Sequence, residues 1–200
     1  MTIRSLVLPA AIALCLGSLP AMAKGPGGGP PAPTPVLSAE EAGTLLWMRE
    51  EEKLAHDVYV ALDAQWDLAV LERIAASEQR HFDALGDKLD RYGLTDPTLP
   101  GEGTFSVADL QALYDDLVAA GLGSSAEALT VGATIEDLDI LDLLHAIEQT
   151  DQPDLERTYD NLLEGSKNHL RAFVRELRAL GLDYEPQYID PLLFDAIVGV

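Results

Sequence analysis

Apolar residues recur at intervals of three and four along most of the chain after residue 38, which is the spacing of one face of an α-helix. Start and stop signals divide this pattern into four long segments, with one short segment between the second and the third. The long segments cover about 38–63, 68–92, 125–149 and 154–180, and the short one covers about 107–120. The pattern therefore predicts an all-α protein.

Residues typical of helix ends support these boundaries. A serine followed three positions later by an acidic residue predicts a cap at Ser38–Glu41, Ser106–Asp109 and Ser124–Glu127. Gly93 and Gly181 follow the second and fourth long helices, where glycine commonly ends a helix.

The lengths of the connections predict how the helices pair. Breaks at 65–67 and 150–153 are so short that each joins two neighbouring antiparallel helices. Residues 93–123 contain two prolines and five glycines and predict a long crossover that carries the short helix. Two antiparallel hairpins joined by one long crossover form a four-helix bundle. We expect residues 183–200 to pack along this bundle, with a short final helix.

The first 23 residues have the pattern of a signal peptide. Arg4 precedes an apolar run from Leu6 to Leu16, and a small-residue motif ends at Ala23, where we expect cleavage. The apolar run is too short to span a membrane comfortably. The expected location of the protein is therefore the periplasm or the outside of the cell.

Composition narrows the function further. Residues 24–37 are rich in glycine and proline and predict a flexible linker, which leaves 38–200 as the folded domain. The 13 Lys and Arg residues against 34 Asp and Glu residues give a net charge of −21, which argues against nucleic acid or anionic lipid as a partner. The single cysteine, Cys15, lies in the expected signal peptide, which excludes an intrachain disulfide and a cysteine-based metal site.

Polar residues interrupt the apolar face of each long helix. They are Glu78 and His81 in the second helix, Glu136 in the third and His169 in the fourth, while Glu51 and Glu52 both touch the face of the first, Glu51 more centrally. A buried carboxylate costs several kcal/mol unless it is paired or bound to a metal ion. A divalent cation would remove this penalty, and clustered Glu and His suit iron or manganese.

Other acidic and histidine residues are not expected to be metal ligands. Asp142 and His145 have a similar spacing, but both fall on the polar face of their helix, and we interpret them as solvated, as we do His56. Asp139 and Glu164 fall at the edges of apolar faces and are not assigned as ligands. A buried Glu–His pair can also be a structural hydrogen bond, so a cluster without metal remains an alternative.

Four sequence blocks resemble the ferritin-like family catalogued as domain of unknown function 2202. They are REEEKLAHDVY (49–59), IAASEQRHFDAL (74–85), VGATIEDLDILDL (131–143) and YDNLLEGSKNHLRAF (159–173), and the similarity covers about 40–190. The resemblance implies a ferritin-like four-helix bundle. The wider ferritin–rubrerythrin group has a first-helix Glu followed seven residues later by Tyr, which favours Glu52, with Tyr59, over Glu51.

The same resemblance implies a ligand set. Its members are Glu52, Glu78, His81, Glu136 and His169, with Tyr59 as a candidate catalytic residue that hydrogen-bonds a ligand or passes an electron. Ser166 stands where the group has a Glu that bridges two metal ions. Three carboxylates leave about one positive charge on two Fe²⁺ ions, so either a di-iron centre completed by an anion or a centre with one metal fits.

These observations predict an exported ferritin-like protein that binds iron, or alternatively manganese, in its core. The expected chemistry is that of a ferroxidase or peroxidase-type oxidoreductase, with O₂ or H₂O₂ as the oxidant. The alternative is a non-catalytic metal-binding or interaction module with a degenerate or empty site. We expect a monomer or a homodimer without a membrane span.

Overall fold

The computed structural model describes residues 36–199, and over this range it contains six helices and no strand. The helices are α1 (Ala39–Trp66), α2 (Ala69–Tyr92), α3 (Ala108–Gly121), α4 (Ser125–Gln149), α5 (Pro153–Ala179) and α6 (Pro191–Val198). The predicted all-α class is confirmed. The expected signal peptide, 1–23, and nearly all of the expected linker lie outside the described residues.

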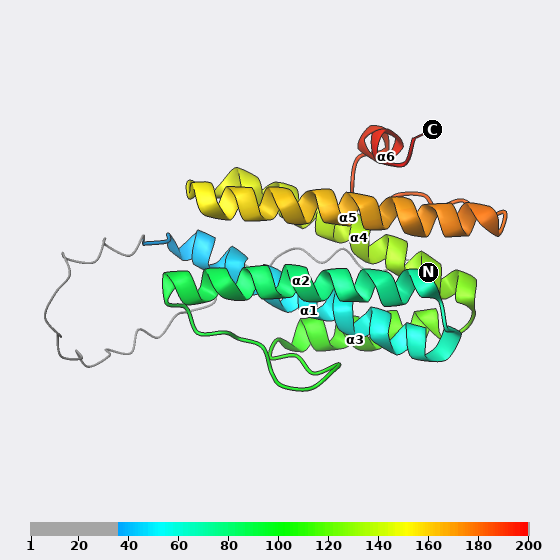
Figure 1. Ribbon diagram of the computed structural model, residues 1–200, viewed down its shortest axis with the longest axis horizontal. Coiled ribbons are helices and arrows are strands. Elements are labelled where there is room, and N and C mark those ends of the chain that lie inside the picture. The colour runs from blue at the N-terminus through cyan, green and yellow to red at the C-terminus, as the bar shows by residue number, and fades with distance from the viewer. Residues whose placement is uncertain (1–35, 200) are drawn as a thin grey trace, which may run out of the picture.

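The four long helices form two hairpins, α1 with α2 and α4 with α5 (Figure 1). Helix α1 packs against both α2 and α4, and α5 packs against both α4 and α2, so the four enclose one core. The long connection between the hairpins carries α3, which packs against the outside of α1 and α4. The short helix α6 packs against α5. This packing fits the predicted four-helix bundle.

Local capping explains two of the helix starts. At α1 the capping box is present, because Glu41 N donates to Ser38 Oγ at 3.1 Å and Ser38 N donates to Glu41 Oε2 at 2.8 Å. At α4 the side chain of Ser124 accepts a hydrogen bond from the backbone of Glu127. Both predicted caps are confirmed.

Two predicted boundaries are wrong in detail. Helix α3 begins after Val107 without a side-chain cap, so Ser106 lies one residue before the cap position, and its hydroxyl donates to Glu50 Oε1, a buried acceptor on α1. Helix α1 continues to Trp66, beyond the expected end at 63. It ends at Asp67, which adopts the left-handed conformation with φ 51°.

The segment before α6 is anchored on α4 by one buried carboxylate. Asp137 is fully buried and accepts hydrogen bonds from the hydroxyl of Tyr184 at 2.9 Å and from three backbone amides. These amides belong to Gln187, Tyr188 and Ile189. The predicted packing of the tail along the bundle and its short final helix are confirmed.

The core between the helices is mainly aliphatic, with a few aromatic side chains. Phe173 packs where a Cβ on residue 132 would lie 2.5 Å from its ring, so α4 needs Gly132 at this contact. The ring of Tyr59 lies 5.4 Å from that of Phe173. Within residues 36–199, no helix has both the length and the apolar character required to cross a bilayer.

Candidate metal centre

Two groups of Glu and His side chains meet in the bundle core. The first is Glu52, Glu78 and His81, and the second is Glu78, Glu136 and His169. Within each group, one possible ligand atom from every residue lies within 4.8 Å of the others. Glu78 belongs to both groups. The five residues that the sequence predicted as ligands are therefore close together, and their role as ligands stays a prediction.

Helix geometry brings these side chains to one place. Glu78 and His81 are three residues apart on α2, so they leave the helix on the same face. Glu52 comes from α1, Glu136 from α4 and His169 from α5. The three glutamates are only 1–2% exposed.

Glu78 lies between the two imidazoles. Its Oε2 is 2.8 Å from Nδ1 of His81, and its Oε1 is 2.7 Å from Nδ1 of His169. A second carboxylate lies 3.4 Å from each of these nitrogens, Glu52 for His81 and Glu136 for His169. The two rings are stacked with their centroids 5.5 Å apart. The arrangement is thus nearly symmetric about Glu78.

The hydrogen-bonding of these polar groups tests whether a metal ion fits among them. Despite the short distances, neither Nδ1 of His81 nor Nδ1 of His169 has a hydrogen-bond partner, and neither do Oε1 of Glu52 and Oε1 of Glu78. Buried polar atoms without partners are unusual and costly. A cation bound among them would satisfy all four, and carboxylate oxygen with imidazole nitrogen is a ligand set suited to iron or manganese. The residues fit a metal ion.

Tyr59 is linked to this cluster through Glu136. Its hydroxyl donates to Oε1 of Glu136 at 2.5 Å and lies 3.4 Å from the carbonyl oxygen of Gly132. Burial and the charge of Glu136 raise the pKa of Tyr59 well above its usual value. The phenol is therefore a neutral donor that orients the Glu136 carboxylate.

The histidines and the carboxylates shift each other's pKa values. Burial lowers the pKa of His81, but its contacts with Glu52 and Glu78 outweigh this and raise it to about 11. Burial likewise lowers the pKa of His169, and the charge of Glu136 and the contact with Glu78 raise it to about 10. Burial raises the pKa of Glu78, yet the contacts with His169 and His81 lower it overall. Contact with the two imidazoles therefore favours the ionised form of Glu78.

The pKa values of the two outer carboxylates, Glu52 and Glu136, are raised. Burial and the charge of Asp139 raise the pKa of Glu52 well above its usual value. Burial and the charge of Glu78 raise the pKa of Glu136 to about 7. Three acids so close together repel one another, and this repulsion is what a bound cation would relieve.

Asp139 is a buried acid that the sequence left unassigned. It is 6% exposed, and its Oδ2 accepts a hydrogen bond at 2.5 Å from the hydroxyl of Ser166, which is fully buried on α5. Its Oδ1 has no hydrogen-bond partner. The sequence signal that could have identified it is its position three residues after Glu136, on the same side of α4.

The interpretation of Asp142 as a solvated residue is wrong. Asp142 is 8% exposed, and after burial its charge is the largest cause that raises the pKa of Glu51. Helix α4 packs against α5, α1 and α3, so it buries more than a single stripe. Glu51 belongs to neither Glu/His group. His145 is exposed, as expected.

The other two residues set aside in the sequence also lie outside the cluster. His56 is partly exposed, and its Nδ1 lies 2.9 Å from Oδ1 of Asp57. Glu164 is exposed and pairs with Lys167 at 2.7 Å. Neither residue is part of a Glu/His group.

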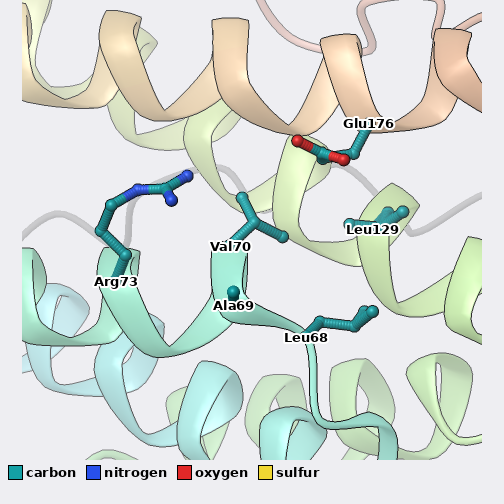
Figure 2. Close-up of a pocket in the computed structure, with 6 residues that line it drawn as sticks. All are labelled: Leu68, Ala69, Val70, Arg73, Leu129 and Glu176. Carbon is teal, nitrogen blue, oxygen red and sulfur yellow. The ribbon is translucent and has the colours of Figure 1, made fainter.

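A surface hollow of about 170 Å³ lies at the start of α2, away from the cluster. Its lining consists of Leu68, Ala69, Val70, Arg73, Leu129 and Glu176, and Figure 2 shows Arg73 and Glu176 reaching toward it from α2 and α5. None of the Glu/His residues lines it, so this hollow is separate from the candidate centre.

Comparison with known proteins agrees with the resemblance in the sequence. Residues 41–200 match the family described as "Uncharacterized protein domain (DUF2202)". The chain is 47% identical over 168 residues to the uncharacterized protein MJ0754 of Methanocaldococcus jannaschii, a match that covers 84% of this chain and 91% of that protein. The crystal structure of hypothetical protein MJ0754 is similar with a TM-score of 0.81 at 45% identity, covering 87% of this chain and 98% of that chain. The chain belongs to the DUF2202 family.

Proposed function

We propose that this protein is an exported, ferritin-like metal protein that binds iron, or alternatively manganese, in its bundle core. Glu52 and His81 would hold one ion, Glu136 and His169 would hold the other, and Glu78, which lies between the two histidines, would be shared by both. The observation that carries this proposal is the position of Glu78, which contacts both histidines while each histidine also faces a second carboxylate.

The arrangement of the helices supports a ferritin-like topology. One hairpin supplies Glu52 from α1 and the Glu-x-x-His pair from α2, and the other supplies Glu136 from α4 and His169 from α5. Metal sites built inward from facing helices of two hairpins are typical of ferritin-like carboxylate proteins. The long connection that carries α3 between the hairpins is also typical of them.

The chemistry divides between the metal and the chain. Bound iron would supply the electrons for reduction of O₂ or H₂O₂, as redox metals do in proteins. The chain holds the ligands in place: Tyr59 keeps its proton and orients Glu136 through a hydrogen bond, as partners behind metal ligands do. The net charge of −21 attracts cations toward the protein.

Iron binding to the protein purified from its native compartment tests the proposal. Fe²⁺ is added without oxygen, the bound iron per chain is measured by mass spectrometry, and air is then admitted. We expect about two ions per chain, oxidation after air is admitted, and loss of bound iron in Glu78→Gln. Glu164→Gln, an exposed acid on α5, is the matched control. No retained iron, or equal retention in Glu78→Gln, would contradict the proposal.

Ser166 favours a second candidate, a metal-binding module without turnover. The position that carries a bridging Glu in ferritin-like proteins is here a buried serine. The same preparation distinguishes the two functions. An enzyme continues to oxidise Fe²⁺ added in excess over its metal sites, whereas a binding module takes up no more iron once its sites are full. A cluster held only by protons would show unchanged melting with Fe²⁺ or Mn²⁺.

A further inference from the structure

Asp139 is a buried carboxylate of which one oxygen accepts a hydrogen bond and the other accepts none. Ser166 donates its hydroxyl to Oδ2, and Oδ1 has no partner although Asp139 is 6% exposed. A buried carboxylate oxygen without a donor costs free energy. A cation, a proton or a buried water molecule would supply the missing partner.

The position of Asp139 favours a cation shared with the Glu/His groups. It follows Glu136 by one turn of α4, so both side chains leave the helix on the same side. Asp139 is not a member of either Glu/His group, but it contacts Ser166, which lies one turn before His169 on α5. Asp139 is thus next to Glu136 on its own helix and next to the turn of α5 that supplies His169.

The balance of charge between the metal ions and the carboxylates also favours Asp139 as a ligand. Two divalent ions carry four positive charges, and the carboxylates of Glu52, Glu78 and Glu136 leave about one of them without a counter-charge. Asp139 supplies the fourth negative charge from within the core. With it, the centre is neutral and needs no additional anion.

We propose that Asp139 is a fourth carboxylate ligand of the metal centre, supplied by α4 in place of the α5 position that Ser166 occupies. Ser166 holds Oδ2, which leaves Oδ1 to bind the metal, and so acts as the hydrogen-bonding partner that orients a ligand. This inference rests on the metal centre proposed above.

Mn²⁺ binding by the full chain tests the assignment, with Mn²⁺ alone as the probe. We expect Asp139→Asn to weaken the binding of at least one ion by about tenfold or more, with its fold checked by circular dichroism. Asp142→Asn is the matched control, because it removes another buried acid of α4 that faces Glu51 and not the cluster. We expect its affinity to stay within about twofold of the unsubstituted chain.

The outcomes separate the two proposals. If the unsubstituted chain binds neither Mn²⁺ nor Fe²⁺ added without oxygen, the metal centre itself is wrong. If it binds Mn²⁺ and Asp139→Asn binds it equally well, only the role of Asp139 is wrong. Anomalous diffraction from the unsubstituted chain with Mn²⁺ gives a second test that needs no variant: a peak within bonding distance of Oδ1 supports the inference. Peaks that touch Glu78 and Glu136 but not Asp139 would overturn it.

Discussion

The backbone of Gly165 on α5 lies directly against the imidazole of His81 on α2. A Cβ on residue 165 would be 2.6 Å from both Cε1 and Nε2 of His81. The Nε2 edge of the ring therefore faces α5, while Nδ1 faces Glu52 and Glu78. Any side chain at 165 must displace the ring from its present position between α5 and these carboxylates.

Gly165→Ala is expected to displace His81 and to weaken metal binding on that side of the centre by about tenfold, together with a loss of about 1–3 kcal/mol in stability from overpacking. Mn²⁺ titration and urea denaturation measure the two effects. Gly43→Ala is the control, because a Cβ at that helical position meets nothing within 4 Å. It should leave binding unchanged and raise stability by about 0.5–1 kcal/mol. Unchanged Mn²⁺ affinity in Gly165→Ala would contradict this prediction.

Tyr59→Phe removes the hydrogen bond that orients Glu136. We expect a loss of about 1–3 kcal/mol in stability, because a buried acceptor loses its donor, and weaker binding of the ion held by Glu136 and His169. Tyr159→Phe is the matched control, since the hydroxyl of Tyr159 is buried without a partner and its removal should be neutral or stabilising. Equal stabilities for the two variants would show that the Tyr59 hydroxyl has no such role.

Asp137→Ala should release the segment before α6 from α4. The carboxylate accepts hydrogen bonds from Tyr184 and from three consecutive backbone amides, so its loss leaves several donors unpaired. We expect a destabilisation of about 3–5 kcal/mol and faster amide hydrogen exchange at residues 187–189. Asp183→Ala, an exposed acid in the same segment, is the control. Slow exchange in Asp137→Ala would mean that other contacts anchor the segment.

Sequence patterns predicted the features of this fold that depend on local interactions. The helices and the caps at Ser38 and Ser124 follow from residues three or four positions apart, so the sequence alone identifies them. Ser106 was assigned wrongly because its partner, Glu50, is 56 residues away on another helix. A local pattern carries no information about such a competitor.

Prediction of the site from local sequence patterns is limited in the same way. Glu51 and Glu52 are adjacent, and both touch the apolar face of α1. Glu52 faces His81 on α2. The pKa of Glu51 is raised by burial and then by the charge of Asp142 on α4. Which of the two joins the cluster depends on how α1 rotates between its neighbours. Burial of Asp139 was missed, although it lies three residues after Glu136, because a single apolar stripe was assumed for α4, which packs on three other helices.

The pKa values of the cluster predict how stability depends on pH when no metal is bound. The pKa values of His81 and His169 are raised to about 11 and about 10, so between pH 7 and pH 10 the folded protein holds protons that the unfolded chain, with a histidine pKa of about 6.5, has lost. Stability therefore falls as the pH rises through this range, by up to about 1.4 kcal/mol per pH unit for each proton. Asp139, with its pKa raised to about 8, contributes in the same direction.

Metal binding should remove this dependence, because a bound cation replaces those protons and the rise of its affinity with pH offsets the fall in metal-free stability. Urea denaturation at pH 7, 8.5 and 9.5, with a chelator or with excess Mn²⁺, measures both cases. Glu78 does not alter the sign in this window, since its pKa is lowered and it is ionised throughout. His145→Gln, which changes an exposed histidine, should keep the slope, whereas His169→Gln should reduce it. A metal-free protein whose stability stays constant from pH 7 to 9.5 would show that the histidines are neutral, and the cluster would then lack the protons that a metal ion is expected to displace.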